Sequence, residues 1–367
     1  MITCARIFQQ NTVYYFSNAP HHIMGIFSFL GNKNYLGVDL GAGGIIFVEL
    51  QNEKGRARLY TYAFTDRLYT TGLPSFIDAP KETADLIKQM KKKAKVKTKK
   101  VVAGLPIASV FNSVVVVPKG SDKEIRLAIQ GQVKKLINVQ IEEMVLDYKI
   151  LTPTKDTLPQ KSASGEGVQS RLSKTTPVLV TGASKTMVRK YATLFGQTGL
   201  DLVSLETEAF ALVRSLIGKD KAVSMIVDVG TVRTNIIIVD NGIPYITRSL
   251  DFGGAALTKV MSKTLSLDPV AAEQMKTDMK SIAALYPADT FPKIFVSAIT
   301  PLLTELRYSI DLFHGMDAIQ DAKRVVEKIV LTGGSSVLPM LAQTIADHIH
   351  IKTYNGDPWA RVICPDG

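Results

Sequence analysis

The chain has 367 residues, of which 46% are hydrophobic and 21% charged, and its formal net charge at pH 7 is +11. This length exceeds one compact core and predicts a soluble α/β protein with at least two lobes. Every apolar run is shorter than the ~20 residues that span a membrane. The only cysteines, Cys4 and Cys364, lie near opposite ends, which favours a reducing compartment and indicates neither a disulfide framework nor a thiolate metal site.

The N-terminal region shows no clear periodicity over residues 1–23, and a new apolar stretch begins at residues 24–30. A charged n-region, a continuous apolar h-region and a small-residue cleavage site are all missing, so a signal peptide is not predicted. Phe27, Phe29 and Leu30 are expected to pack on the first lobe, with contact to a membrane surface as the alternative.

A strand, a polar turn and a second strand are predicted over residues 35–50, around Asp39-Leu40-Gly41-Ala42-Gly43-Gly44. An acid at the end of a buried strand, followed by small residues, suits a phosphate loop. Its carboxylate can hold a metal through water while the backbone N–H groups surround an anion. A single turn of this kind is more often an ordinary hairpin.

Lysines are concentrated at the end of a helix predicted over residues 81–93 and in the loop before a strand at 101–105. Cations are favoured at a helix C-terminus, so the simplest interpretation is a solvated helix end. Contact with anionic lipid headgroups or an acidic partner is the alternative. No aromatic residues alternate with the lysines, which argues against nucleic-acid binding. The members are Lys88, Lys91, Lys92, Lys93, Lys95, Lys97, Lys99 and Lys100.

A separate small α/β module is predicted next. Ser121 is expected to cap a helix with an apolar stripe, and strands are predicted at 144–151 and 178–181. Residues 152–177 are rich in Thr, Ser, Pro, Gly and Lys, which is typical of a flexible surface loop. A helix over 184–197 and a strand over 200–205 complete this region.

The strand–turn–strand pattern recurs over residues 225–239, around Asp228-Val229-Gly230-Thr231, and a second turn follows at Asp240-Asn241-Gly242. Two copies in the same setting, half a chain apart, predict two related lobes. We expect each lobe to aim one turn at a shared cleft, with Asp39 and Asp228 close together.

The second half holds further candidates. Glu206 lies at a strand–helix junction, where a carboxylate positions a water or simply charges a helix N-terminus. Gly253-Gly254 begins a helix whose N–H groups are expected to face a phosphate. Glu273 and Lys276 suit an ordinary surface ion pair. The strand 329–332 leads into Gly333-Gly334-Ser335 and a helix near Met340, and such a turn lets a flat ring approach the backbone.

In chain order, four of these motifs resemble the nucleotide motifs of the actin-like ATPase superfamily. Within it the chain resembles the PilM family of type IV pilus assembly proteins, on the branch shared with FtsA. The signs are residues 24–29, Val145-Leu146-Asp147-Tyr148, residues 208–214 and the helix Ala272-Glu273-Gln274-Met275-Lys276. The motifs are Asp39-Leu40-Gly41, Asp228-Val229-Gly230-Thr231, Gly253-Gly254 and Leu331-Thr332-Gly333-Gly334-Ser335.

The resemblance implies an actin-like (ribonuclease H-like) two-lobe fold that binds ATP and Mg²⁺, with Asp39 and Asp228 on the metal. Glu206 would be the water-facing acid. It also implies a cytoplasmic protein at the inner face of the cytoplasmic membrane that grips the cytoplasmic tail of a PilN-like protein and contacts other pilus assembly proteins. The implied nucleotide residues are Asp39, Gly41, Ala42, Gly43, Gly44, Asp228, Gly230, Thr231, Asn235, Gly253, Gly254, Glu273, Lys276, Gly333, Gly334 and Ser335.

The same resemblance suggests domain limits. They are an N-terminal extension at 1–33, lobe one (subdomain 1A) at 34–118, an inserted 1C-type subdomain at 119–199, a return to lobe one at 200–222 and lobe two at 223–367. Relatives continue past Asp357-Pro358-Trp359 into a final strand and helix, so a last C-terminal element is expected to be missing.

Departures from the family pattern affect the expected activity. The family's first loop carries serines and then a lysine, whereas this chain has Ala42, Gly43, Gly44 and Ile46. Fewer hydroxyls and no cation weaken transition-state stabilisation, so binding without appreciable turnover is expected. An FtsA-like division protein and an actin-fold small-molecule kinase are the alternatives.

Overall fold

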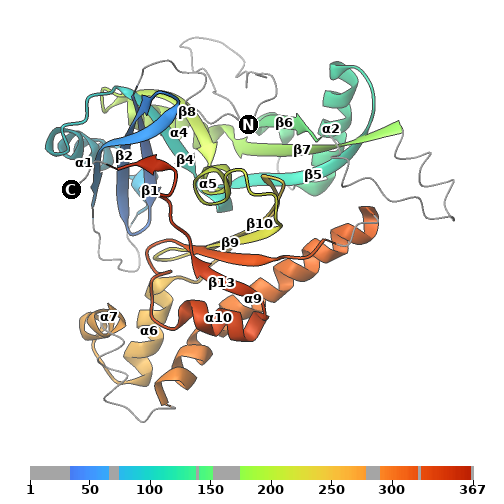
Figure 1. Ribbon diagram of the computed structural model, residues 1–367. Helices are drawn as coiled ribbons and strands as arrows, with labels where there is room; N and C mark the ends of the chain where they lie inside the picture. The colour runs from blue at the N-terminus through green and yellow to red at the C-terminus, as the bar shows by residue number, and fades with distance from the viewer. Residues whose placement is uncertain are drawn as a thin grey trace.

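The computed structural model describes residues 34–65, 74–137, 140–151, 174–277, 290–320 and 324–364. Within these ranges the strands form three sheets, and helices pack against them (Figure 1). The apolar stretch at 24–30 lies outside the described residues, as does most of the predicted loop, of which residues 174–177 are described.

The first sheet has six strands in the order β14-β3-β2-β1-β4-β8. β1 pairs antiparallel with β2, and β2 with β3, whereas β4 runs parallel to β1 and β8 parallel to β4. Leu36, Phe47 and Phe195 lie in the core between this sheet and the helices α1 and α4. The bounds are β1 Tyr35–Gly41, β2 Gly44–Glu53, β3 Arg56–Phe64, β4 Lys100–Leu105, β8 Asp201–Thr207, β14 Val362–Ile363, α1 Pro80–Lys93 and α4 Lys185–Gly196.

The second sheet has five strands in the order β11-β10-β9-β12-β13. Both faces of its central strand are buried, because Met225 and Val227 face one apolar cluster while Ile226 faces another. This explains why β9 reads as a continuous apolar run in the sequence. The bounds are β9 Ser224–Val229, β10 Thr234–Asp240, β11 Ile243–Leu250, β12 Lys328–Thr332, β13 Lys352–Asn355, α6 Gly254–Thr264, α7 Pro269–Thr277, α9 Thr290–Gln320 and α10 Leu341–Ile349.

The third sheet contains β5 (Val110–Pro118), β7 (Thr175–Ser184) and β6 (Met144–Ile150), in that order, with α2 (Asp122–Leu136) packed on one face. The predicted cap is confirmed: Ser121 and Glu124 form a reciprocal capping box at the start of α2. β5 pairs with β7 along its whole length, although the sequence places it before the inserted module. The domain limits therefore stay a prediction.

Two crossings connect the first and second sheets. The first runs from β8 through α5 (Glu208–Leu212) and the π-helical turn η6 (Val213–Ile217) to β9, and the second runs from β13 to β14. In Figure 1, α5 lies between the two sheets. Single 3₁₀ turns are η2 (Phe76–Asp78), η3 (Ile107–Ser109) and η4 (Ile141–Glu143). Among the described residues, none of the helices combines the length and apolarity that crossing a bilayer requires.

Candidate functional site

The first Asp-x-Gly turn joins β1 to β2, and Gly41 lies opposite Gly44 at its end. Glycine is required at position 44, because a Cβ there would lie 1.9 Å from the carbonyl oxygen of Thr65. Asp39 is accessible to water, yet protein atoms fill much of the space around its carboxyl group. This burial, together with the charge of Asp228, raises the pKa of Asp39 to about 6.

The second turn joins β9 to β10 with the same geometry, and Asp228 lies opposite Asn235 in the ladder. Asn235 Nδ2 donates a hydrogen bond of 3.1 Å to Asp228 Oδ2. Burial raises the pKa of Asp228, and the bond from Asn235 partly offsets that rise. The turn closes through a 2.9 Å bond from the Gly230 N–H to the Arg233 carbonyl.

The two turns meet. A Cβ on Gly43 would lie 2.2 Å from Thr231 Oγ1, so the tip of one turn contacts the tip of the other. The charge of Asp228 also contributes to the raised pKa of Asp39. The predicted proximity of the two aspartates is therefore present in the structure.

A third carboxylate belongs to this group, and it is Glu208. Its Oε2 accepts bonds from the Ile107 N–H at 3.2 Å and from Asn235 Nδ2 at 3.4 Å. Burial, followed by the charge of Asp39, raises the pKa of Glu208 to about 8. Sequence reasoning missed this residue, although the pair of acids in Glu206-Thr207-Glu208 was a visible signal.

The structure does not bring Glu206 to this group. Both of its carboxylate oxygens accept hydrogen bonds from the guanidinium of Arg214, and the residue is 6% exposed. A buried carboxylate held in a bidentate ion pair has a structural role in joining β8 to η6. Glu208 therefore replaces Glu206 as the candidate acid.

The Gly253-Gly254 turn packs directly on the second turn. A Cβ on Gly253 would lie 2.6 Å from the Gly230 carbonyl oxygen. The N–H groups of Gly254 and Ala255 donate to the carbonyls of Gly230 and Thr231 at 3.0 and 2.8 Å. The expectation that these N–H groups face a phosphate is therefore wrong here, because the turn's own carbonyls occupy them.

Lys276 is 8% exposed, so the expected surface pair with Glu273 is in fact partly buried. Its Nζ lies 2.7 Å from Glu273 Oε1 and donates to Thr258 Oγ1 at 3.0 Å and to the Gly254 carbonyl at 3.3 Å. These bonds fix the ammonium group at the start of α6.

The Gly333-Gly334-Ser335 turn follows β12, which runs parallel to β9. Gly333 has φ +87°, and a Cβ there would lie 2.5 Å from Asp228 Oδ1. Ser335 binds the second turn through its N–H to the Val229 carbonyl at 2.9 Å, and its Oγ donates to the Gly230 carbonyl at 3.3 Å. Gly334 is exposed, with open space around it. The motifs of the second half thus converge on Asp228.

The donor set fits a magnesium ion. Three carboxylates with raised pKa values lie together, and Mg²⁺ is typically held by one or two carboxylates, waters and phosphate oxygens. Within the part of the chain that the structure describes, no three Asp, Glu, His or Cys side chains are close enough to hold an ion by themselves. A magnesium ion here would therefore take most of its ligands from water and phosphate oxygens.

Comparison with known proteins supports the same architecture. The family model "Type IV pilus assembly protein PilM" matches residues 37–365. A solved PilM–PilN type IV pilus biogenesis complex contains a chain with 24% identity and a TM-score of 0.70, with 91% of each chain covered. MreB5 of Spiroplasma citri, solved with ADP, has 12% identity and a TM-score of 0.50, with 89% of this chain and 92% of that chain covered. The fold is actin-like, and the chain belongs to the PilM family of type IV pilus assembly proteins.

Proposed function

We propose that this protein binds Mg-ATP between its two Asp-x-Gly turns and serves as a cytoplasmic adaptor of the type IV pilus machine. The observation that carries the proposal is the meeting of the two turns, which groups Asp39, Asp228 and Glu208. Neighbouring carboxylates repel one another, and a divalent cation that arrives with a polyphosphate offsets that repulsion.

Each motif then has a role. Asp39 and Asp228 hold the magnesium ion through water, and Glu208 orients water beside them. The bound metal would neutralise phosphate charge. The N–H groups of the two turns, from residues 41–44 and from Thr231, bind phosphate oxygens. The exposed Gly334 leaves room for the nucleoside, which Glu273, Lys276 and Ser335 would border.

Hydrolysis is proposed to be weak or absent. Ala42, Gly43 and Gly44 supply no hydroxyl and no cation to the first turn. Phosphoryl transfer depends chiefly on positioned charge around the transferred group. Glu208 is moreover protonated over part of the neutral range, because its pKa is about 8, and it then serves poorly as a base.

The partner is proposed to be the cytoplasmic tail of a PilN-like inner-membrane protein. Family membership and the likeness to a PilM chain solved with PilN support this choice. A ligand held by residues from both lobes favours the closed arrangement. Nucleotide is therefore proposed to change the affinity for the tail, at the inner face of the cytoplasmic membrane, where other pilus assembly proteins would also bind.

The nucleotide proposal is tested by calorimetric titration of Mg-ATP into the protein and into Asp228→Ala. The variant should keep its melting temperature and lose Mg-dependent binding. Asp311→Ala, an exposed aspartate on α9, is the matched control and should bind like the parent. Equal affinity in Asp228→Ala and the parent would contradict the metal role. ADP formation that rises with a small-molecule acceptor, with the phosphoryl group transferred to that acceptor, would instead favour a kinase.

The adaptor proposal is tested separately with a fluorescent peptide of the PilN tail from the same genome. Anisotropy should report binding that a scrambled peptide does not show, and the affinity should differ with and without Mg-ATP. Equal affinity in both conditions would remove nucleotide control, whereas no binding at all would remove the adaptor role.

A further inference from the structure

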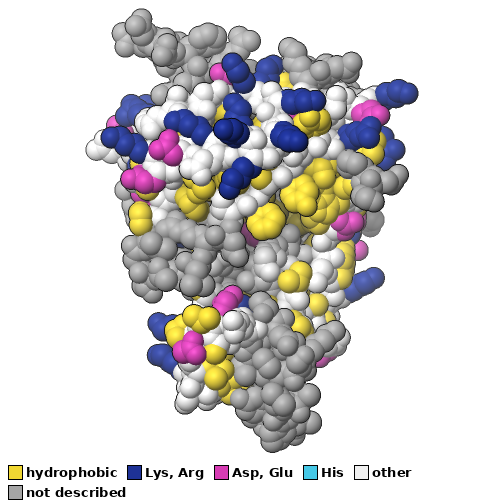
Figure 2. Space-filling view, turned by 90° about the vertical axis from the view of Figure 1, so that its left-hand side faces the viewer, with side chains coloured by type: hydrophobic (Ala, Val, Ile, Leu, Met, Phe, Trp, Pro, Cys, Tyr) yellow, Lys and Arg dark blue, Asp and Glu magenta, His cyan; other side chains and the backbone are white. Residues whose placement is uncertain are grey.

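Lysines gather at the C-terminal end of α1 and along the segment that leads to β4. Figure 2 looks at the α1 side of the molecule, and Lys and Arg side chains (dark blue) gather over its upper half. The helix dipole accounts for the lysines of the last turn only, whereas half of the group lies beyond residue 93. We name the group the α1 lysine cluster: Lys88, Lys91, Lys92, Lys93, Lys95, Lys97, Lys99 and Lys100.

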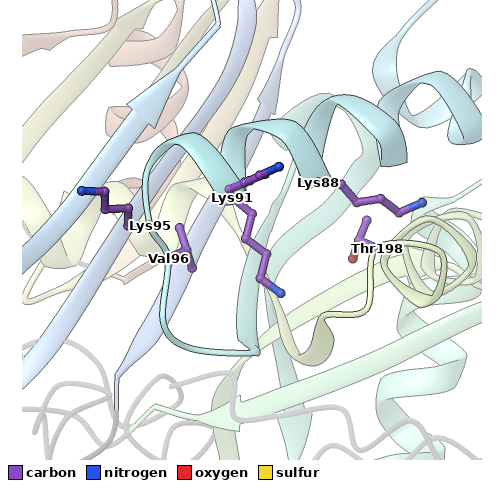
Figure 3. Close-up of a pocket in the computed structure, with 6 residues that line it drawn as sticks. Lys88, Lys91, Lys95, Val96 and Thr198 are labelled. Atoms are coloured by element: carbon purple, nitrogen blue, oxygen red, sulfur yellow. The ribbon is translucent and has the colours of Figure 1, made fainter.

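Part of the cluster surrounds a pocket of about 450 Å³, shown in Figure 3. Four lysines line it, and Val96 and the turn after α4 complete the lining through Thr198. Thr198 is 5% exposed, and its hydroxyl is held by the Phe195 carbonyl at 2.7 Å. The Thr198 side of the pocket is therefore held by a hydrogen bond, and the lysines supply the charge of the lining. The lysines are Lys88, Lys91, Lys92 and Lys95.

The positive charge of the pocket is barely neutralised. Lys88 pairs with Asp85 at 3.1 Å, and both side chains are at least half exposed, so this pair contributes little. Between the described residues, no ion pair forms to Lys91, Lys92 or Lys95. An anion brought to the pocket therefore meets uncompensated charge.

Lys95 occupies a position that normally favours glycine. The end of α1 is a Schellman motif, with Val96 N–H bonded to the Lys91 carbonyl at 3.1 Å and Lys95 N–H bonded to the Lys92 carbonyl at 3.3 Å. Lys95 takes the left-handed conformation there, with φ 53°. A side chain in this conformation is strained relative to glycine. Glycine would avoid this strain, but the position holds a lysine, and that lysine lines the pocket.

The chemistry of the cluster argues against two classes of partner, which are nucleic acids and proteins bound through apolar anchors. Base stacking needs open aromatic faces, but the nearby rings of Tyr60 and Tyr35 are covered by Lys97 at 4.6 Å and Lys100 at 5.6 Å. Protein interfaces are centred on aromatic or aliphatic anchors and are poor in lysine. No large hydrophobic side chain between residues 80 and 105, all of which are described, is exposed.

We infer that the α1 lysine cluster docks the protein on anionic phospholipid headgroups. Four to eight basic residues on an amphipathic helix attract anionic membrane surfaces, and four lysines of the cluster lie on α1. A headgroup phosphate would bind at this pocket, whose lining includes Lys91, Lys92 and Lys95. This goes beyond the proposed nucleotide and tail binding, because it gives the chain a contact with lipid that needs no protein partner.

The test is co-sedimentation of the full chain with vesicles of phosphatidylglycerol and phosphatidylcholine, against vesicles of phosphatidylcholine alone. Each lysine near an anionic surface contributes about fivefold to partitioning. Lys91→Gln/Lys92→Gln/Lys95→Gln should therefore bind roughly 100-fold more weakly. The control Lys123→Gln/Lys259→Gln/Lys263→Gln removes the same charge from exposed lysines elsewhere and should bind like the parent. Binding should also fall when salt rises from about 0.1 M to about 1 M.

Lys95→Gly separates docking from folding. It should raise the melting temperature by relieving the left-handed residue, while vesicle binding falls about fivefold. Failure of the parent to bind anionic vesicles at low salt would overturn the inference, as would equal loss in the control triple variant. If the parent binds polyglutamate but not the vesicles, and the cluster triple variant alone loses polyglutamate binding, the cluster binds an acidic protein and the lipid assignment is wrong.

Discussion

Gly43 and Thr231 belong to turns half a chain apart and lie in contact, so that a Cβ on Gly43 would be 2.2 Å from Thr231 Oγ1 and 3.3 Å from Thr231 Cβ. This contact sets how closely the two lobes approach at the point where Asp39 and Asp228 interact. A glycine at position 43 therefore permits the approach of the turns, and it does so by lacking a side chain.

Gly43→Ala should separate the turns. Insertion of a methyl group into a packed contact costs about 1–3 kcal/mol of unfolding free energy, and Mg-ATP affinity should change as well. Thr231→Ala removes the clashing hydroxyl, so the double variant should recover part of the loss. Urea unfolding of all four proteins in a double-mutant cycle measures the coupling. Additive effects would mean that the two residues do not meet in solution.

The two acids at the end of β8 should behave differently. Glu206→Ala leaves the partly buried Arg214 without its carboxylate, and we expect a loss of about 1–3 kcal/mol in unfolding free energy. Glu208→Gln removes an acid whose charged form is disfavoured in the folded state, so stability should hold or rise while Mg-dependent ATP affinity falls about tenfold or more. Urea unfolding and calorimetry check both. The reverse pattern would restore Glu206 as the candidate acid.

The sequence was sufficient for the strands around Asp39 and Asp228, because a buried apolar run followed by an acid and a glycine is a local pattern. The meeting of the two turns was predicted from the repetition of that pattern half a chain apart. The choice between Glu206 and Glu208 was not local. Glu206 lies in β8, which ends at Thr207, whereas Glu208 is the first residue of α5, and their partners differ because they belong to different elements. Arg214 pairs with Glu206 because η6, which contains Arg214, returns the chain to the end of β8.

Two further features could not be predicted from the sequence. One is that the N–H groups of Gly254 and Ala255 are occupied, and the other is that β5 pairs with β7. Both depend on which segments the tertiary fold brings together, and local propensity does not specify such pairings. Burial of Lys276 has the same origin, because α7 packs on α6.

Stability without ligand should fall as pH rises. The pKa of Glu208 is raised from 4.5 to about 8 in the folded state, by burial and then by the charge of Asp39. Between these values the folded chain keeps a proton that the unfolded chain has lost, so unfolding releases protons and the free energy of unfolding decreases with pH. Asp39 adds to the slope between 3.8 and about 6.

Urea unfolding at several pH values checks this slope, and Glu208→Gln should flatten it between about 4.5 and about 8. Glu82→Gln, an exposed glutamate on α1, is the control and should leave the slope unchanged. A stability that rises with pH over this window in the parent would contradict the raised pKa.

Arg361 joins the two crossings between the lobes. Its guanidinium donates to the carbonyls of Ser215 and Ile217, the latter at 2.8 Å, at the end of the π-helical turn η6. Gly218 follows with φ 62°, and a Cβ there would lie 2.4 Å from Arg361 Nε. The crossing from β13 to β14 is thereby hydrogen-bonded to the crossing from β8 to β9. Because Arg361 is exposed, Arg361→Ala should cost only about 1 kcal/mol of unfolding free energy.

The larger effect of Arg361→Ala is expected in local motion, because a π-helical turn lacks the regular bonding of an α-helix. Amide hydrogen exchange should accelerate over residues 213–218 and 356–364 together, since each crossing restrains the other. Arg189→Ala, an exposed arginine on α4, should change neither. Gly218→Ala should reproduce the acceleration, because its Cβ displaces the guanidinium. Faster exchange in one crossing alone would show that the crossings move independently, and Arg361 would then be only a cap on η6.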